Sequence, residues 1–244
     1  CVTSFILILY STFLTRSGIL GDSSVHSFTD LGLSGQLLVY LLSFLLISVY
    51  LLVSRWKDIP YSDKEAKVYT GDFWLFIGVY TLILMSFQVI LPTSIPVYNA
   101  IIEVFGGFSN LAPPVEKELF YSNAQIWFAS CLALLSSIAQ VLWWRGKQVK
   151  EKFALFSKSI VFTMIFSSLI ILFYPITVPS YMVLITASLF SIFSNGSVLI
   201  FFYTKKDLFS SGSIAHIGLA IMLIGILFSS GYSSIQSNNY TGLV

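Results

Sequence analysis

The chain contains two histidines, His26 and His216, and these are the residues whose type and position best support chemistry. An imidazole titrates close to neutral pH and binds transition metals through a neutral ring nitrogen. His26 lies in the polar stretch GDSSVHSFTD, whereas His216 lies in the apolar stretch SGSIAHIGLAIMLIG. Each of them could be a ligand to a metal centre. The alternative for His26 is a solvent-exposed loop residue, and the alternative for His216 is a hydrogen-bonded structural residue.

Other chemistry has little support in the sequence. There is no nucleotide-phosphate loop, nucleophile elbow or HExxH sequence, and no carboxylate lies well inside an apolar run. Cys1 and Cys131 lie in hydrophobic runs without CxxC spacing, which argues against thiol redox chemistry and zinc binding. Three amides do lie within apolar runs, and we expect them to form hydrogen bonds between helices: Gln88, Gln140 and Asn195.

The composition is that of a membrane protein. Of the 244 residues 56% are hydrophobic and 10% are charged, which excludes an ordinary soluble globule. A transmembrane helix needs about 20 apolar residues, and six runs meet this length: 33–54, 73–91, 122–144, 157–174, 180–203 and 214–230. A seventh run, 2–14, is too short and follows no initiator Met, so we expect a span truncated at its N-terminus. The predicted fold is all-α: a polytopic integral membrane helix bundle with six complete transmembrane helices and one truncated helix. We expect residues 1–244 to be the C-terminal part of a longer protein.

The basic residues predict the orientation of these spans. Eleven of the thirteen Lys and Arg residues fall in three segments, which by the positive-inside rule are cytoplasmic: 55–67, 145–158 and 205–206. The other two, Arg16 and Lys117, lie in the alternate loops. The loop that contains His26 and the C-terminal tail are therefore predicted to face outside. A net charge of only +2 gives no support for nucleic acid binding.

The predicted orientation separates the two histidines. His216 stands near the cytoplasmic start of the last span and His26 lies outside, so most of a hydrocarbon layer of about 30 Å lies between them. They cannot both bind one iron. Gly218 and Gly225 are seven residues apart and therefore share a helix face. His216 projects about 200° round the helix from Gly218, on roughly the opposite side. We therefore expect the last helix to pack against a neighbour with its glycines and to direct its imidazole elsewhere.

Two segments resemble a known family. TFLTRSGILGDSSVHSF (12–28) and SIAHIGLAIMLIGILFSSGYS (213–233) are similar to the cytochrome c-type biogenesis heme lyase family, CcmF, of the heme-handling superfamily shared with CcsA, and among its members to the Bacteroidetes type. Segments 73–99 and 110–123 follow the family's order of a further span and an outward Pro-Pro loop. The resemblance implies that His26 is an axial ligand of heme held at the outer face, and that His216 is an axial ligand of a b-type heme within the bundle. Arg16 is a candidate partner for a heme propionate, or alternatively an anchor at the membrane interface.

The resemblance also implies a function for the whole protein. Such a protein takes heme from a membrane-anchored heme chaperone and attaches it to the CxxCH segment of apocytochrome c, together with other cytochrome c maturation subunits. Quinol is the implied electron donor, and the bacterial cytoplasmic (inner) membrane is the implied location, with the His26 loop and the C-terminus on the periplasmic side. The family's tryptophan-rich outer motif has no counterpart among the five tryptophans of this chain. We therefore expect the heme platform and the partner histidines to lie upstream, and this chain alone to bind heme poorly and to be inactive.

Two alternative functions remain open at this stage. One is a membrane transporter or permease subunit, in which the histidines are structural or linked to proton movement, although the sequence shows neither an inverted repeat nor a broken helix. The other is a purely structural assembly subunit, whose function would survive replacement of both histidines. A heme spectrum distinguishes the heme protein from both alternatives.

Overall fold

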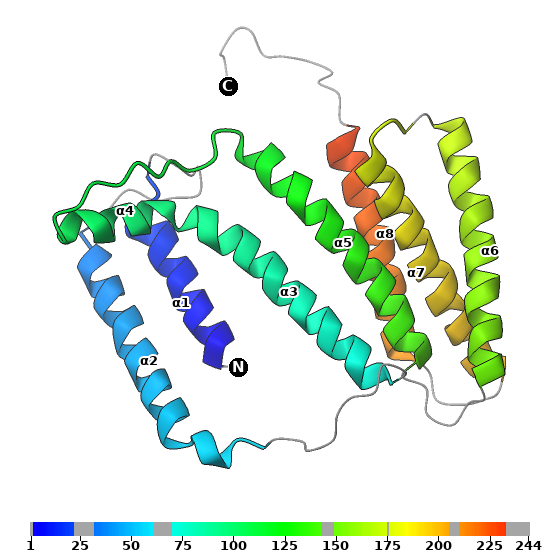
Figure 1. Cartoon of the computed structure of the whole chain (residues 1–244), viewed down its shortest axis with the longest axis horizontal. Coiled ribbons are helices and arrows are strands. Elements are labelled where there is room, and N and C mark those ends of the chain that lie inside the picture. The colour runs from blue at the N-terminus through cyan, green and yellow to red at the C-terminus, as the bar shows by residue number, and fades with distance from the viewer. Residues whose placement is uncertain are drawn as a thin grey trace, which may run out of the picture. The chain divides into compact units, whose positions relative to one another are not determined.

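The computed structural model describes residues 2–21, 32–60, 70–142, 149–174, 176–204 and 210–232. These residues form helices and connecting segments with no strand, which confirms the all-α fold (Figure 1). In chain order the elements are α1 (Val2–Arg16), α2 (Ser34–Ser54), the short 3-10 helix η1 (Trp56–Asp58), α3 (Gly71–Thr93), α4 (Ile95–Val104), α5 (Lys117–Leu142), α6 (Val149–Phe173), α7 (Pro179–Thr204) and α8 (Ser211–Gly231).

Six helices of the described part are long and apolar enough to cross a membrane, and they coincide with the six predicted runs. They are α2, α3, α5, α6, α7 and α8. The prediction of six complete spans is confirmed. The short apolar run at the N-terminus forms the helix α1, of 15 residues.

The helix α4 was not expected from the sequence. Pro92 lies in the last turn of α3, and Pro96 stands at the start of α4. A proline is tolerated in the first turn of a helix because its missing N–H has no partner there in any case. The two prolines thus mark the end of one helix and the beginning of the next, with Ser94 between them.

The described chain divides into two compact units, and the first comprises residues up to Glu65 together with Val89–Val115. Its core lies between α1 and α2 and is formed by Phe13, Leu14, Leu20 and Leu41. The Tyr10 hydroxyl donates a hydrogen bond to the Ser94 Oγ, which ties α1 to the junction of α3 and α4.

The second unit comprises Ala66–Gln88 and the chain from Glu116 onward. Its central element is α7, which packs against α5, α6 and α8 (Figure 1). Helices α5 and α7 run in one direction, and α6 and α8 run in the other. The apolar core near the start of α7 is formed by Ile176, Leu184, Ile185, Leu189 and Leu227.

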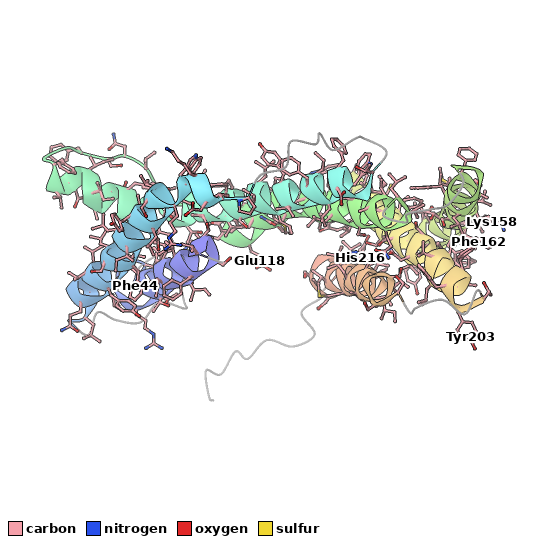
Figure 2. All side chains as sticks on the ribbon, turned by 90° about the horizontal axis from the view of Figure 1, so that it is seen from below. Phe44, Glu118, Lys158, Phe162, Tyr203 and His216 are labelled. Carbon is pink, nitrogen blue, oxygen red and sulfur yellow. The ribbon has the colours of Figure 1, made fainter. Side chains whose placement is uncertain are left out.

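Large apolar side chains cover the outside of the helices (Figure 2). Leu46 is 68% exposed, Phe76 is 65% exposed and Leu172 is 78% exposed. Exposing such side chains to water costs about 1.5–3 kcal/mol each, whereas a bilayer solvates them. The apolar surface and the six long helices identify the chain as a multi-pass membrane protein.

Candidate functional site

The helix that carries His216 begins at a capping residue. The Ser210 Oγ accepts a hydrogen bond from the Ser213 backbone N–H at 3.4 Å, and it also accepts one from the Gln140 Nε2 of α5 at 2.9 Å. A serine in this position satisfies a backbone N–H that the helix leaves without a partner. The start of α8 is thereby held against α5.

His216 lies on the face of α8 that packs into the second unit. Ser213, Ala220 and Leu227 are buried, at intervals of seven residues, and His216 is half-buried between the first two. Figure 2 labels His216 on α8. Positions three, four and seven residues apart share a helix face. The imidazole therefore belongs to the packed stripe of the helix.

The expectation that Gly218 and Gly225 form this packing face is wrong for the described part of the chain. Both glycines are exposed, and a Cβ added to either would have no neighbouring heavy atom within 4 Å. A seven-residue spacing identifies residues that share a face, but Ser213, Ala220 and Leu227 have the same spacing as the glycines. The small side chains of Ser213 and Ala220 allow the close approach that was attributed to glycine.

The contacts between α7 and α8 place a second polar residue at the depth of His216. The two helices are antiparallel, and Leu184 and Leu227 belong to the same buried cluster. Eleven residues, about three helical turns, lead from Leu227 back to His216 and from Leu184 forward to Asn195. The pairing of Gly231 with Tyr181, where an added Cβ would lie 3.0 Å from the tyrosine ring, gives the same register to within one residue. His216 and Asn195 therefore lie at matching levels of neighbouring helices.

Asn195 belongs to a buried polar cluster at the centre of the unit. Its side chain is fully buried, and the Nδ2 group donates to the Ser191 carbonyl at 2.9 Å and to the Ser191 Oγ at 3.3 Å. The Ser191 Oγ in turn lies 3.1 Å from the Ser136 Oγ of α5. Three further atoms of α7 are buried without a hydrogen-bond partner: the Ser188 Oγ, the Ser194 Oγ and the Asn195 Oδ1.

The three intramembrane amides behave differently from one another. Gln88 accepts a hydrogen bond from Gln125 of α5, and Gln140 bonds Ser210 at the start of α8, so for these two the prediction of bonds between helices is confirmed. The Asn195 Nδ2 group instead forms both of its hydrogen bonds with Ser191 within α7, and neither of them joins two helices. The sequence analysis did not predict the buried serines of this cluster or the unpaired amide oxygen. The only available signal was the spacing of Ser188, Ser191 and Asn195 on one face of a helix that is otherwise apolar.

The chemistry available to His216 is that of a single ligand. Within the described ranges no group of three or more His, Cys, Asp and Glu side chains could hold a metal ion, and no hydrogen bond to the imidazole is present. A site built from protein ligands alone requires three or four of them. Heme iron already has four porphyrin nitrogens and needs only axial ligands from the protein. A half-buried imidazole at the level of a buried amide oxygen can supply one ligand to a metal whose other ligands come from elsewhere.

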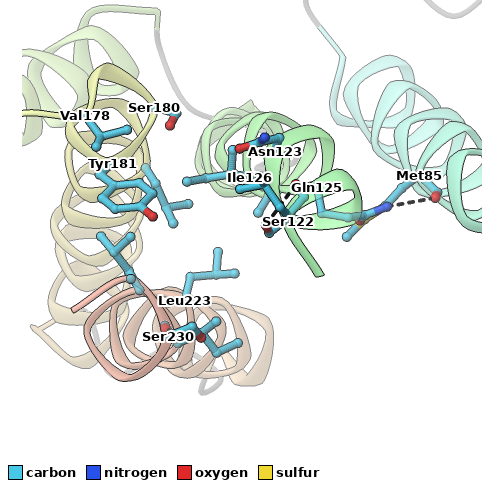
Figure 3. A pocket seen from close by; sticks show the side chains of 16 residues that line it. Met85, Ser122, Asn123, Gln125, Ile126, Val178, Ser180, Tyr181, Leu223 and Ser230 are labelled. Carbon is cyan, nitrogen blue, oxygen red and sulfur yellow. Dashed lines mark hydrogen bonds between the residues drawn. The ribbon is translucent and has the colours of Figure 1, made fainter. Parts of the chain in front are cut away.

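A cavity of about 310 Å³ lies at the other end of the same helices (Figure 3). Its lining is mainly aliphatic, with neutral polar groups and no charged side chain, and comes from α3, α5, α7 and α8. On α8 the lining begins at Leu223, seven residues or about two turns after His216. The Gln125 side chain at the cavity donates to the Met85 carbonyl at 3.2 Å. The cavity suits an uncharged, largely apolar molecule, and it does not include His216.

His26, predicted to bind heme at the outer face, lies outside the described residues. The structure does describe the start of its loop, where α1 ends at the exposed Arg16 and Gly18 adopts a φ of 75°. This left-handed conformation is accessible to glycine at little cost. Leu20 then packs back among the side chains of α1 and α2. The RSG segment thus forms a fixed turn at the beginning of the loop.

Fold and site together define a multi-pass membrane helix bundle in which the imidazole of the described residues, His216, is half-buried at the level of a buried polar cluster. No protein-family model, curated protein or solved structure matches the chain.

Proposed function

We propose that this chain is part of a membrane heme lyase of the cytochrome c maturation system, in which His216 is an axial ligand of a b-type heme. The observation that carries the proposal is the position of this imidazole, half-buried on the packed stripe of α8 at the level of the buried polar cluster of α7. The resemblance of residues 213–233 to the heme lyase family supports the same assignment.

In this proposal the bound heme supplies one-electron chemistry, and the protein supplies position and surroundings. The neutral imidazole is the form that binds iron through a ring nitrogen. One histidine cannot fill both axial positions, so a second ligand comes from elsewhere. Quinol, drawn from the bilayer, is the proposed electron donor.

The second part of the proposal concerns the outer face of the bacterial cytoplasmic membrane. His26 holds heme there for attachment to the CxxCH segment of apocytochrome c, after delivery by a membrane-anchored heme chaperone. Arg16, at the end of α1, is a candidate partner for a heme propionate. The support for this part is the resemblance of residues 12–28 and the predicted outward position of their loop.

The test is the visible spectrum of the full-length protein purified from membranes, oxidised and reduced with dithionite, together with cytochrome c maturation in cells. We expect a b-type spectrum that His216→Ala abolishes or strongly weakens. We expect His26→Ala to retain that spectrum and to abolish maturation. Ile214→Ala is the matched control, because Ile214 is exposed on the same turn of α8 as His216. A wild-type protein without heme, and maturation that survives both histidine replacements, would overturn the proposal.

A permease subunit is the second candidate, and the cavity at the far end of the bundle is the observation that favours it. Its neutral, mainly aliphatic lining could admit an uncharged apolar compound from the bilayer. Filling the cavity with Ala129→Trp separates the two functions. In a permease, Ala129→Trp would abolish transport. In a heme protein, Ala129→Trp would leave the His216-dependent heme spectrum unchanged.

A further inference from the structure

The inference concerns the Asn195 Oδ1, one of three buried side-chain oxygens in the described part of the chain that have no hydrogen-bond partner. The orientation of this amide is determined by its neighbours. The Ser191 carbonyl can only accept a hydrogen bond, so the group that faces it at 2.9 Å must be the Nδ2. The Oδ1 therefore points away from that carbonyl and requires a donor of its own.

An unpaired amide oxygen is costly at this depth. Leaving a buried acceptor without a partner costs about 1–3 kcal/mol, and a hydrocarbon surrounding offers no bulk water in compensation. The unpaired hydroxyls of Ser188 and Ser194 differ in this respect, because a hydroxyl can rotate toward the carbonyl four residues earlier in its own helix. An amide oxygen has no such intrahelical donor, so its partner must come from a neighbouring helix or from a water molecule.

The facing helices narrow the choice of donor. On α5 the hydroxyls of Ser136 and Ser137 both donate to the Ala133 carbonyl, and the Gln140 amide donates to Ser210. The two serine hydroxyls are therefore already engaged, and one of the two Nε2 hydrogens of Gln140 is engaged by Ser210. On α8 the polar side chain at the level of Asn195 is His216, which lies on the packed stripe and forms no hydrogen bond within the described part of the chain.

We propose that Asn195 is a positioning residue for His216, and that its Oδ1 accepts a hydrogen bond from one ring N–H of His216, directly or through one ordered water. A neutral imidazole has one N–H and one lone pair, so this bond selects the tautomer and leaves the other nitrogen free as a ligand. Histidines that bind metals commonly donate their second nitrogen to a carbonyl or carboxylate in this way. The ligand role rests on the proposed function, whereas the hydrogen bond does not require heme.

The serine cluster keeps the acceptor in place. Asn195 bonds Ser191 through its Nδ2, and Ser191 contacts Ser136 of α5. The side chain of Asn195 is therefore fixed from the side opposite to its free oxygen. An orientation determined by α5 and α7 is in this way transmitted to the imidazole of α8.

The test uses the chain labelled with ¹⁵N-histidine, without heme, in lipid bilayers. Because the chain has two histidines, the variant His26→Ala leaves His216 as the only imidazole in the solid-state NMR spectrum. We expect one protonated and one unprotonated ring nitrogen from a single tautomer. Asn195→Leu, which removes the acceptor, is expected to give a mixture of both tautomers.

Three further variants keep the result decisive. Ser194→Ala is the matched control, because Ser194 is the adjacent buried and unpaired residue of α7, and it should leave the single tautomer unchanged. If Asn195→Leu does not fold, Asn195→Ala removes the acceptor with less steric change, and Asn195→Asp restores an acceptor and the single tautomer. An unchanged tautomer in the acceptor-free variant overturns the assignment of Asn195.

The heme-loaded protein gives an independent measurement. Loss of a partner that orients a metal ligand weakens metal affinity by about 10–100-fold, so Asn195→Leu is expected to weaken heme binding by this factor while Ser194→Ala does not. A protein that binds no heme but shows the Asn195-dependent tautomer refutes the proposed function alone. A protein that binds heme equally well with and without Asn195, and shows no change of tautomer, refutes the positioning role alone.

Discussion

At the scale of single residues, the turn after α1 depends on one glycine. Gly18 has a φ of 75°, and the Gly21 backbone N–H donates to its carbonyl at 2.9 Å. A side chain in this conformation costs about 1–2 kcal/mol because its Cβ approaches the following carbonyl oxygen. The residue thus directs the chain away from the membrane helix and into the loop that contains His26.

We predict that Gly18→Ala destabilises the protein by about 1–2 kcal/mol, measured as a lower midpoint of thermal unfolding in detergent or lipid nanodiscs. Gly35→Ala is the matched control, because Gly35 lies in the first turn of α2 and an added Cβ meets no atom within 4 Å. Alanine is favoured over glycine in a helix, so the control should be neutral or slightly stabilising. Equal effects of the two substitutions would show that the left-handed turn is absent.

At the scale of helices, the structure assigns two opposite faces to α8. The face with Ala220 is buried in the second unit, whereas the face with Gly218 and Gly225 is exposed. Ala220 is only 1% exposed. A larger side chain at this position must displace its neighbours, because packed interiors do not absorb extra volume freely.

We predict that Ala220→Leu destabilises the bundle by about 1–3 kcal/mol through overpacking. Gly218→Leu adds still more side-chain volume on the exposed face, and it is expected to be neutral or to stabilise α8 by up to about 1 kcal/mol through helix propensity. The midpoints of thermal unfolding of the two variants provide the comparison. The opposite order would mean that the glycine face is the packed one, as the sequence alone suggested.

The helices themselves were predictable because the thickness of the bilayer determines both their length and their composition. All six apolar runs became helices, and α4 was missed because a helix of ten residues is too short to give a membrane signal. The packed face of α8 was not predictable, since several sets of residues share a seven-residue spacing and only the neighbouring helix selects among them. For the same reason, His216 could be recognised as a candidate ligand, but its relation to Asn195 depends on the register between α7 and α8.

At the scale of the whole molecule, the positive-inside rule determines the predicted orientation. Within the second unit, the directions of the helices are consistent with it, because the end of α6 and the start of α7 lie on one side of the bundle and the end of α7 lies on the other. Tyr174 and Tyr203 mark these two sides, and both are well exposed, at 63% and 81% (Figure 2 labels Tyr203). The outward role of His26 requires that Tyr174 be outside and Tyr203 inside.

We predict that a membrane-impermeant maleimide labels Tyr174→Cys in intact cells and labels Tyr203→Cys only after the membrane is opened. The background is a variant in which Cys1 and Cys131, the two cysteines of the chain, are replaced by alanine. The pair is matched in residue type and exposure, so a difference in labelling reports the side of the membrane rather than local access. Labelling of Tyr203→Cys but not of Tyr174→Cys in intact cells would show that the topology is the opposite of the predicted one. It would place the His26 loop in the cytoplasm, where it could not present heme to an exported apocytochrome, although His216 could still bind heme within the bundle.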